Sequence, residues 1–291
     1  MPEKLKRMDV AKGIMYLGIV FIVAICVYPF LNVLAYSFSD RVAVMSGKVT
    51  VWPIHFQLDA YKEILKQAQV WAAMRVSVIV TLSGTLLGLL MTVCAAYALS
   101  KPDLRGGKIF TGFILFTMYF GGGIIPTFLV VKSIGLYDSL FALVLPSAMN
   151  VFNFIVMRTF FRNISKELKE AALIDGAGDM TILIKIVLPL SLPILATIGL
   201  YYAVDYWNDY FSALLYIQTP EKFSLQLRLR QILFAGQLDQ MLGSADSAGV
   251  KIMPETLKMA SIVVTTLPII VIYPWLQKYF VKGVMVGSVK G

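Results

Sequence analysis

The sequence predicts an all-α membrane protein with six transmembrane helices. Apolar residues make up 58% of the 291 residues and charged residues only 15%, whereas about 25% of the residues in a typical soluble domain are charged. This excess of apolar residues fits a chain whose solvent is lipid. Windows without Asp, Glu, Lys or Arg, each long enough for a helix to cross about 30 Å of hydrocarbon, cover residues 13–39, 76–100, 109–131, 139–157, 186–204 and 259–277.

The windows predict helices because none alternates strictly between apolar and polar residues, as a barrel strand would. The first window is too long for a signal peptide and lacks a small-residue cleavage site, so we expect a retained helix. Six spans place both termini on one side, which receives fifteen of the Lys and Arg residues against eleven on the other. The positive-inside rule therefore predicts cytoplasmic termini, and the net charge of +9 is no sign of nucleic-acid binding.

Two features between the spans carry structural expectations. "FQLDAYKEILKQAQVWAAM", within the outer loop at 40–70, is typical of an amphipathic helix along the membrane interface. "YFGGGIIPTF" at 119–128 indicates either a break in the third span or close helix packing through small residues.

Residues 162–186 form the longest cytoplasmic segment and predict two short helices separated by a turn. Ser165 can cap the first helix, and Glu167 lies in its first turn, where the helix dipole favours an anion. Gly176 or Gly178 can adopt the left-handed conformation that ends this helix. Asp179 is expected to cap the second helix. The start of the following span carries Pro189 and Pro193, where proline is least costly.

No pattern of catalytic residues is present in the sequence. Cys26 and Cys94 lie within predicted spans and His55 in an outer loop, and there is no phosphate-binding glycine loop, paired-carboxylate site or Cys/His cluster. We therefore expect no enzyme activity, no metal site and no cofactor bound by this chain. A membrane-embedded sugar-transferring enzyme would need acidic or His residues gathered at one membrane face. It stays a distant alternative, as does an assembly scaffold.

The segment "EAALIDGAGDMTILIKIVLPLSLP" resembles the EAA loop of ABC-importer permeases. The similarity continues over about residues 70–285 in "SVIVTLSGTLLGLLMTVCAAYALSK", "GGGIIPTFLVVKSIGLYDS" and "YWNDYFSALL". These stretches are similar to the carbohydrate class, on the side of the smaller maltose-type permease and its polysaccharide and lipo-oligosaccharide branch. The positions that match the loop pattern are Glu170, Ala171, Ala172, Asp175, Gly176, Ala177, Leu188, Pro189 and Pro193.

The resemblance implies a type I ABC-importer transmembrane fold in a bacterial cell membrane. It implies that residues 170–178 form the coupling helix, seated on an ATP-binding cassette subunit. Implied partners are a homologous permease, two cassette subunits that bind ATP and Mg, an extracytoplasmic solute-binding protein and an oligosaccharide. A permease for amino acids or peptides is the nearest alternative. The expected divisions are a lead with the first helix (1–69), the permease domain (70–285) and a cytoplasmic tail (286–291).

Polar residues inside spans are the candidates for the substrate pathway, because they usually face a bundle interior or a cavity. Asn150 and Asn153 are three residues apart and share a helix face, and Asp205 and Asn208 share a side with Asp209. Amides and carboxylates suit sugar hydroxyls, and aromatic rings suit sugar faces; hydrogen bonding between helices is the alternative. The candidates are Asn150, Asn153, Tyr201, Asp205, Trp207 and Asn208.

Arg228 and Arg230 lie in "FSLQLRLRQ", whose alternation predicts an extended segment with both side chains on one face. Such a pair could bind carboxylate or sulfate groups in a bidentate manner. Three roles are open for it: docking of the solute-binding protein, which we favour, guidance of an acidic oligosaccharide, and a merely solvated face.

Overall fold

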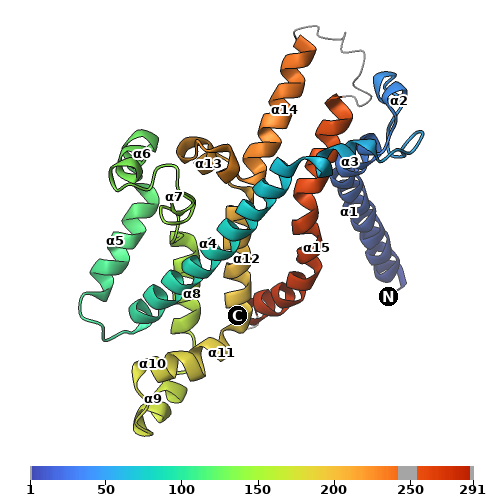
Figure 1. Cartoon of the computed structure of the whole chain (residues 1–291). Coiled ribbons are helices and arrows are strands. Elements are labelled where there is room, and N and C mark those ends of the chain that lie inside the picture. The colour runs from blue at the N-terminus through green and yellow to red at the C-terminus, as the bar shows by residue number, and fades with distance from the viewer. Residues whose placement is uncertain (1, 242–253, 289–291) are drawn as a thin grey trace. The chain divides into compact units, whose positions relative to one another are not determined.

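The computed structural model describes the backbone of residues 2–241 and 254–288, and the side chains of 12–234, 255–272 and 274. Every regular element in the described part of the chain is a helix, as Figure 1 shows. The prediction of an all-α protein is confirmed.

The chain divides into two compact units. One combines Met1–Val70 with Leu229–Leu267, and the other combines Trp71–Arg228 with Pro268–Gly291. The expected divisions at residues 69 and 285 stay predictions, and the proposed tail at 286–291 extends beyond the described residues.

The first unit begins with a long, exposed apolar helix. Its elements are α1 (Pro2–Ser37), α2 (Arg41–Met45) and α3 (Asp59–Lys66), with parts of α14 (Leu225–Met241) and α15 (Pro254–Ser288). Side chains such as Leu17 and Phe21 on α1 are 73% and 66% exposed, as expected of a helix whose solvent is lipid. Asp40 caps α2 by accepting the Ala43 N–H at 2.9 Å.

The prediction of a single amphipathic helix over residues 56–74 is wrong. Helix α3 ends at Lys66, Gln67 adopts an extended conformation, and α4 begins at Ala68. The amphipathic character belongs to α3 alone: Ile64 is buried, and the hydroxyl of Tyr61 is hydrogen-bonded to that of Ser37 at 2.7 Å.

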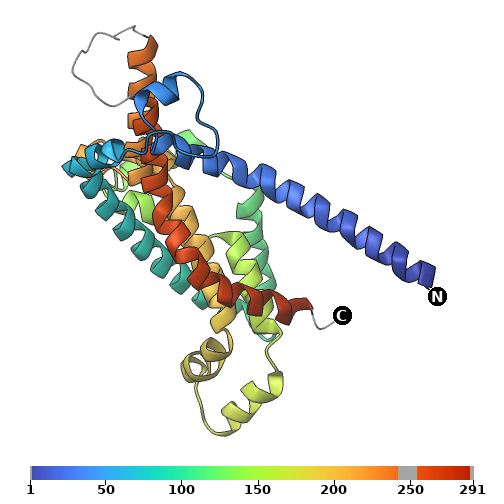
Figure 2. The same cartoon turned by 90° about the vertical axis from the view of Figure 1, so that its right-hand side faces the viewer.

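The second unit carries the elements that matter for function. At one end α9 and α10 project beyond α8 and α12, whereas α6, α7 and α13 lie at the other end (Figures 1 and 2). Its helices are α4 (Ala68–Ser100, from Trp71 on), α5 (Gly107–Tyr119), α6 (Ile124–Ser133), α7 (Phe141–Val144), α8 (Val151–Arg162), α9 (Lys166–Ile174), α10 (Asp179–Ile182), the π-helical turn η1 (Leu183–Val187), α11 (Leu188–Leu190), α12 (Leu192–Asn208), α13 (Phe211–Tyr216) and the short 3₁₀ turn η2 (Pro220–Lys222), with the start of α14 up to Arg228 and α15 from Pro268 on.

The described residues contain three helices that are long and apolar enough to cross a membrane, or up to five spans if each of two bent pairs counts as one. The single helices are Lys12–Ser37, Ala68–Ser100 and Glu255–Ile272, and the bent pairs are α5 with α6 and Asp179–Leu190 with α12. The prediction of a single helix over residues 139–157 is wrong. There α7 ends at Val144 and α8 begins only at Val151, after Pro146 and an Asn150 cap. A charge-free window shows sufficient length but not an unbroken helix.

The third predicted span is broken at its glycines. Helices α5 and α6 meet at 115°, and Gly123 adopts φ +87°, a conformation that favours glycine. A side chain added at Gly121 would meet no atom within 4 Å. The break is therefore confirmed, and close packing within this chain does not explain these glycines.

Two glycines of α4 form a groove for two tyrosines of α12. A Cβ atom added at Gly84 would lie 2.5 Å from the Tyr206 ring, and one at Gly88 would lie 2.9 Å from the Tyr202 ring. Both distances are too short for real contacts, so α12 packs this closely only because these positions have no side chain.

The hydroxyls of the same tyrosines bind the connection between α7 and α8. Tyr202 accepts the backbone N–H of Asn150 at 2.9 Å and is hydrogen-bonded to Thr92 of α4 at 2.7 Å. Tyr206 points to the carbonyl oxygens of Val144 and Ser147 at 3.2 and 3.1 Å. The tyrosine pair thus joins α4, α12 and the start of α8.

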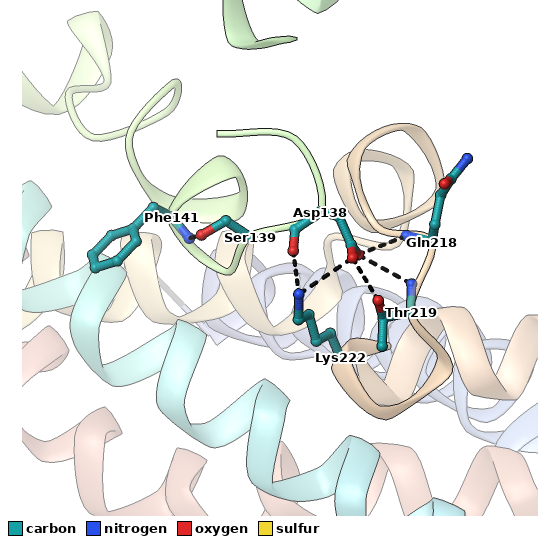
Figure 3. A network of polar contacts seen from close by, with 6 residues as sticks. All are labelled: Asp138, Ser139, Phe141, Gln218, Thr219 and Lys222. Atoms are coloured by element: carbon teal, nitrogen blue, oxygen red, sulfur yellow. Dashed lines mark hydrogen bonds and ion pairs between the residues drawn. The ribbon is translucent and has the colours of Figure 1, made fainter. Parts of the chain in front are cut away.

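Asp138 ties the loop before α7 to the loop after α13 (Figure 3). Its carboxylate accepts the N–H groups of Gln218 and Thr219, each at 3.0 Å, and the Thr219 hydroxyl. Lys222 completes the network with an ion pair at 3.2 Å. The hydrogen bonds from Thr219 and Gln218, with the Lys222 contact, hold the pKa of this carboxyl well below its usual range.

We expect Asp138→Asn to lower the thermal unfolding midpoint of the protein at pH 7, and to do so less at low pH. A carboxyl with a depressed pKa stabilises the fold fully above the pKa of the unfolded chain, about 3.9. This contribution disappears as the pH falls through the folded-state pKa. Unfolding in detergent at pH 7 and pH 2 measures the difference, because most of the loss occurs well below a pH of about 3.9. Asp59→Asn, which breaks an exposed pair with Lys62, should have little effect at either pH; equal effects of both variants would contradict this role.

Candidate functional site

The projecting end of the second unit is the α9–α10 hairpin, residues Lys166–Ile182. Ser165 occupies the N-cap position of α9, but its hydroxyl donates to the Glu167 carboxylate and accepts no backbone N–H. The expected side-chain cap is therefore wrong, whereas Glu167 does lie in the first turn. The Ser165 hydrogen bond is the main cause that lowers the pKa of Glu167.

Of the two glycines predicted to end α9, Gly176 and Gly178, it is Gly176 that does so. It adopts φ +77°, and the next N–H, of Ala177, donates to the Ala172 carbonyl at 2.9 Å, as in a glycine-terminated helix. Asp179 does not cap α10, because Gly178 holds that position. The Asp179 carboxylate instead pairs with the Lys101 ammonium at 2.5 Å.

The inner side of the hairpin is fixed to the helix bundle. Ala172 is buried and Ala177 packs against the main core. The Lys169 ammonium donates to the Phe161 carbonyl at 3.0 Å, and burial lowers the pKa of this lysine, with repulsion from Lys101 adding to the effect. The hairpin is therefore a rigid extension of the bundle rather than a loose loop.

The outer side of the hairpin is exposed and partly apolar. Of the motif residues, Glu170, Ala171, Asp175 and Gly176 are exposed, whereas Ala172 and Ala177 face the bundle. Four exposed apolar side chains lie beside them that were not predicted, although apolar residues in a polar loop indicate a contact surface. They are Leu168, Leu173, Ile174 and Met180, which are 49%, 56%, 87% and 65% exposed.

A bend connects the hairpin to α12. The segments Asp179–Leu190 and Leu192–Asn208 meet at 83°. Pro189 and Pro193 lie in the first turns of α11 and α12, as predicted. Between them the buried Ser191 donates its hydroxyl to the Val187 carbonyl at 2.6 Å.

A polar pocket of about 350 Å³ lies at the other end of α12. Three of the expected pathway residues line it, namely Asn150, Asp205 and Asn208, and Asp209 joins them just after the helix ends. Ser147 and the two tyrosines that pack on α4 also contribute, although the sequence analysis did not propose them. The sequence does contain a signal for the tyrosines: Tyr202 and Tyr206 are four residues apart on one helix, as are Gly84 and Gly88 on the helix that they contact.

The other three expected pathway residues lie elsewhere. Asn153 is 2% exposed and belongs to the packed interior beneath the Asn150 cap. Trp207 is 7% exposed and lines a small apolar pocket with residues such as Leu200 and Ile269. The Tyr201 ring lies beside Phe152, at 6.5 Å between centroids, outside the polar pocket. Their helix positions point them around α8 and α12 to other neighbours, which spacing alone did not reveal.

The pocket chemistry is that of a hydrogen-bonding surface for hydroxyl groups. Two carboxylates, Asp205 and Asp209, lie with two side-chain amides and two tyrosines, and no lysine or arginine is among the lining residues. The Asp209 carboxylate also accepts the Ser212 N–H at 3.0 Å. Among the described residues, no group of three or more His, Cys, Asp or Glu side chains could hold a metal ion.

The extended segment expected around Arg228 and Arg230 is instead the start of helix α14. Residues two apart on a helix point about 200° apart, so the two guanidiniums do not share a face. Arg228 lies over the Phe223 ring at 5.9 Å, and Arg230 over the Phe234 ring at 5.2 Å. The short apolar–polar alternation was compatible with both periods, and the helix prevailed.

Comparison with known proteins agrees with this architecture. Residues 84–286 match the family described as "binding-protein-dependent transport system inner membrane component". The polygalacturonan/rhamnogalacturonan transport system permease protein YtcP of Bacillus subtilis is 47% identical, over 92% of this chain and 93% of that protein. The arabinooligosaccharides transport system permease protein AraQ of Halalkalibacterium halodurans is 27% identical, over 99% of this chain and all of that protein.

A solved structure extends the likeness to three dimensions. It is a bacterial ABC transporter involved in the import of the acidic polysaccharide alginate. One of its chains superimposes with a TM-score of 0.86 at 37% identity, covering 94% of this chain and 98% of that one. The bent spans, the projecting hairpin and the family match agree, and the chain belongs to the family of inner membrane components of binding-protein-dependent transport systems.

Proposed function

We propose that this permease subunit forms half of a membrane pathway for oligosaccharides and that its α9–α10 hairpin couples the pathway to ATP hydrolysis by partner subunits. A permease subunit is not itself an enzyme. The observation that carries the proposal is the polar pocket of α12, which offers carboxylates, amides and hydroxyls within one space. Sugar hydroxyls both donate and accept hydrogen bonds, and a site of this composition meets both needs.

The relatives support a substrate derived from a polysaccharide. One is named for polygalacturonan and rhamnogalacturonan and another acts in the import of acidic alginate. Because Asp205 and Asp209 line the pocket without a cation beside them, we infer that it binds the hydroxyl edges of the sugar. Carboxylates of an acidic sugar would be repelled here and would face the second permease or the solvent.

The partners follow from the same arrangement. A binding-protein-dependent system needs a solute-binding protein outside and ATP-binding cassette subunits inside, and the latter would bind ATP and Mg. The exposed apolar side chains of the hairpin suit insertion into a cleft of a cassette subunit, and a homologous permease would complete the pathway. Arg228 and Arg230 stay candidates for docking the binding protein or guiding the sugar, but as independent residues because they lie on different helix faces.

We expect Glu170→Lys and Ile174→Asp each to reduce the ATP hydrolysis that the loaded binding protein stimulates about ten-fold or more, while leaving the protein inserted in the membrane. Both side chains are exposed, so neither change disturbs the core, and truncation of a central interface residue costs about 2 kcal/mol or more. The measurement is ATP hydrolysis stimulated by the loaded binding protein, with the full transporter in vesicles.

Lys166→Gln serves as the matched control, since it changes an exposed residue at the start of the same helix. Its activity should stay near that of the wild type. Unchanged stimulation in both test variants would show that this hairpin is not the coupling element.

We expect Asn208→Leu to weaken oligosaccharide uptake about five-fold, and Asp205→Asn to act in the same direction. Each change removes a hydrogen-bonding group from the pocket, and a hydrogen bond contributes about 1 kcal/mol net. Uptake is measured over a range of substrate concentrations at equal membrane levels. Tyr201→Phe, on the same helix outside the pocket, should leave uptake unchanged.

These variants separate the pocket face of α12 from its other faces. Loss of uptake in Tyr201→Phe, with Asn208→Leu behaving as the wild type, would place the substrate on another face of α12.

A further inference from the structure

A second, basic pocket lies at the hairpin end of the bundle, away from the proposed sugar site. It has a volume of about 520 Å³ and is formed where α4 ends, α5 begins and α8 ends. Four cationic side chains line it and no carboxylate does: Lys101, Lys108, Arg158 and Arg162. Apart from Lys101, which also pairs with Asp179 of the hairpin, these residues have no part in the function proposed above.

The cations are held in place by contacts that leave a net positive charge. Arg158 donates its Nε–H to the Leu99 carbonyl at 2.8 Å, which fixes the guanidinium at the pocket wall. Lys101 pairs with Asp179 at 2.5 Å and lies over the Tyr97 ring. The lining therefore holds four cations and no carboxylate, and Asp179 beside it pairs with Lys101. An arrangement of this kind suits a phosphate, which accepts several charge-assisted hydrogen bonds at once.

An apolar helix face begins at the rim of the same pocket. Ile109 lines the pocket, and Phe113 and Phe116 follow it at helical spacing on α5. These three side chains are 77%, 68% and 55% exposed. A ligand that fits the whole feature has an anionic head and apolar chains, which a soluble phosphate lacks.

We propose that this pocket binds the headgroup phosphate of an anionic phospholipid, with the acyl chains along the exposed face of α5. The Lys and Arg distribution predicts that this end of the bundle lies on the cytoplasmic side, where anionic lipids attract basic residues. The face of α5 lies in a segment that is apolar enough to be membrane-embedded, so lipid reaches it directly. The proposal does not depend on the identity of the transported sugar.

The test counts lipids retained by the intact transporter. The complex is purified from membranes, placed in nanodiscs with equal phosphatidylglycerol and phosphatidylcholine, and analysed by native mass spectrometry after mild release. We expect phosphatidylglycerol to be retained selectively, and Lys108→Gln/Arg162→Gln to weaken its retention about five-fold for each charge removed, since each basic residue contributes about 1 kcal/mol. Lys108→Gln alone should show half of this effect on a logarithmic scale and changes a single exposed residue.

Arg105→Gln is the matched control, because Arg105 is an exposed cation of the same turn that does not line the pocket. Equal losses in the control and the test variants would assign retention to overall charge and overturn the site. Unchanged phosphatidylglycerol retention in all variants would also overturn the site. A second assay measures how well a ligand protects Lys108 from acetylation. If inorganic phosphate protects it as well as phosphatidylglycerol does, the pocket binds a soluble anion and the lipid proposal is wrong. Release of the cassette subunits from the double variant would identify the pocket as a protein contact instead.

Discussion

The packing of α12 against α4 depends on the absence of side chains at Gly84 and Gly88. The rings of Tyr206 and Tyr202 lie where Cβ atoms would otherwise stand, and the tyrosine hydroxyls reach onward to the connection between α7 and α8. One contact therefore sets both the distance between two membrane helices and the wall of the polar pocket. Since the tyrosines also line that pocket, the same side chains serve packing and the proposed pathway.

The same helix connects the two functional ends of the second unit. Helix α12 starts at the bend after the α9–α10 hairpin and ends at Asn208 in the pocket. The hairpin is fixed to the bundle through Ala172, Lys169 and the Asp179–Lys101 pair. A displacement of the hairpin by a partner would thus be transmitted to α12 as a rigid element. Under the proposed function, this is the physical route by which events at an ATP-binding partner would reach the polar pocket.

Local sequence signals predicted the glycine turn of the hairpin and the prolines at the start of the segment that follows it. Gly176, Pro189 and Pro193 act through backbone conformation, which depends on near neighbours, and the glycine-rich break before α6 is of the same kind. Apart from the Ser165 cap, whose hydroxyl donates to the nearby Glu167, the errors at single residues arise from packing and from partners distant in sequence. The Asp179 carboxylate pairs with Lys101 instead of capping a helix. Asn153 and Trp207 are buried away from the polar pocket, and the segment around Arg228 is helical. Which face of a helix meets its neighbours is decided by packing, and one sequence does not contain that information directly.

The measurement that tests this account most directly is the unfolding midpoint of the transporter carrying Gly84→Ala, compared with Gly112→Ala. Both glycines lie inside helices, and alanine is favoured there by up to about 1 kcal/mol. Overpacking costs about 1–3 kcal/mol, and only Gly84 faces a ring, since a Cβ at Gly112 meets nothing within 4 Å. The account predicts a lower midpoint and reduced uptake for Gly84→Ala, and an equal or higher midpoint for Gly112→Ala. Equal stability and uptake of the two variants would contradict it.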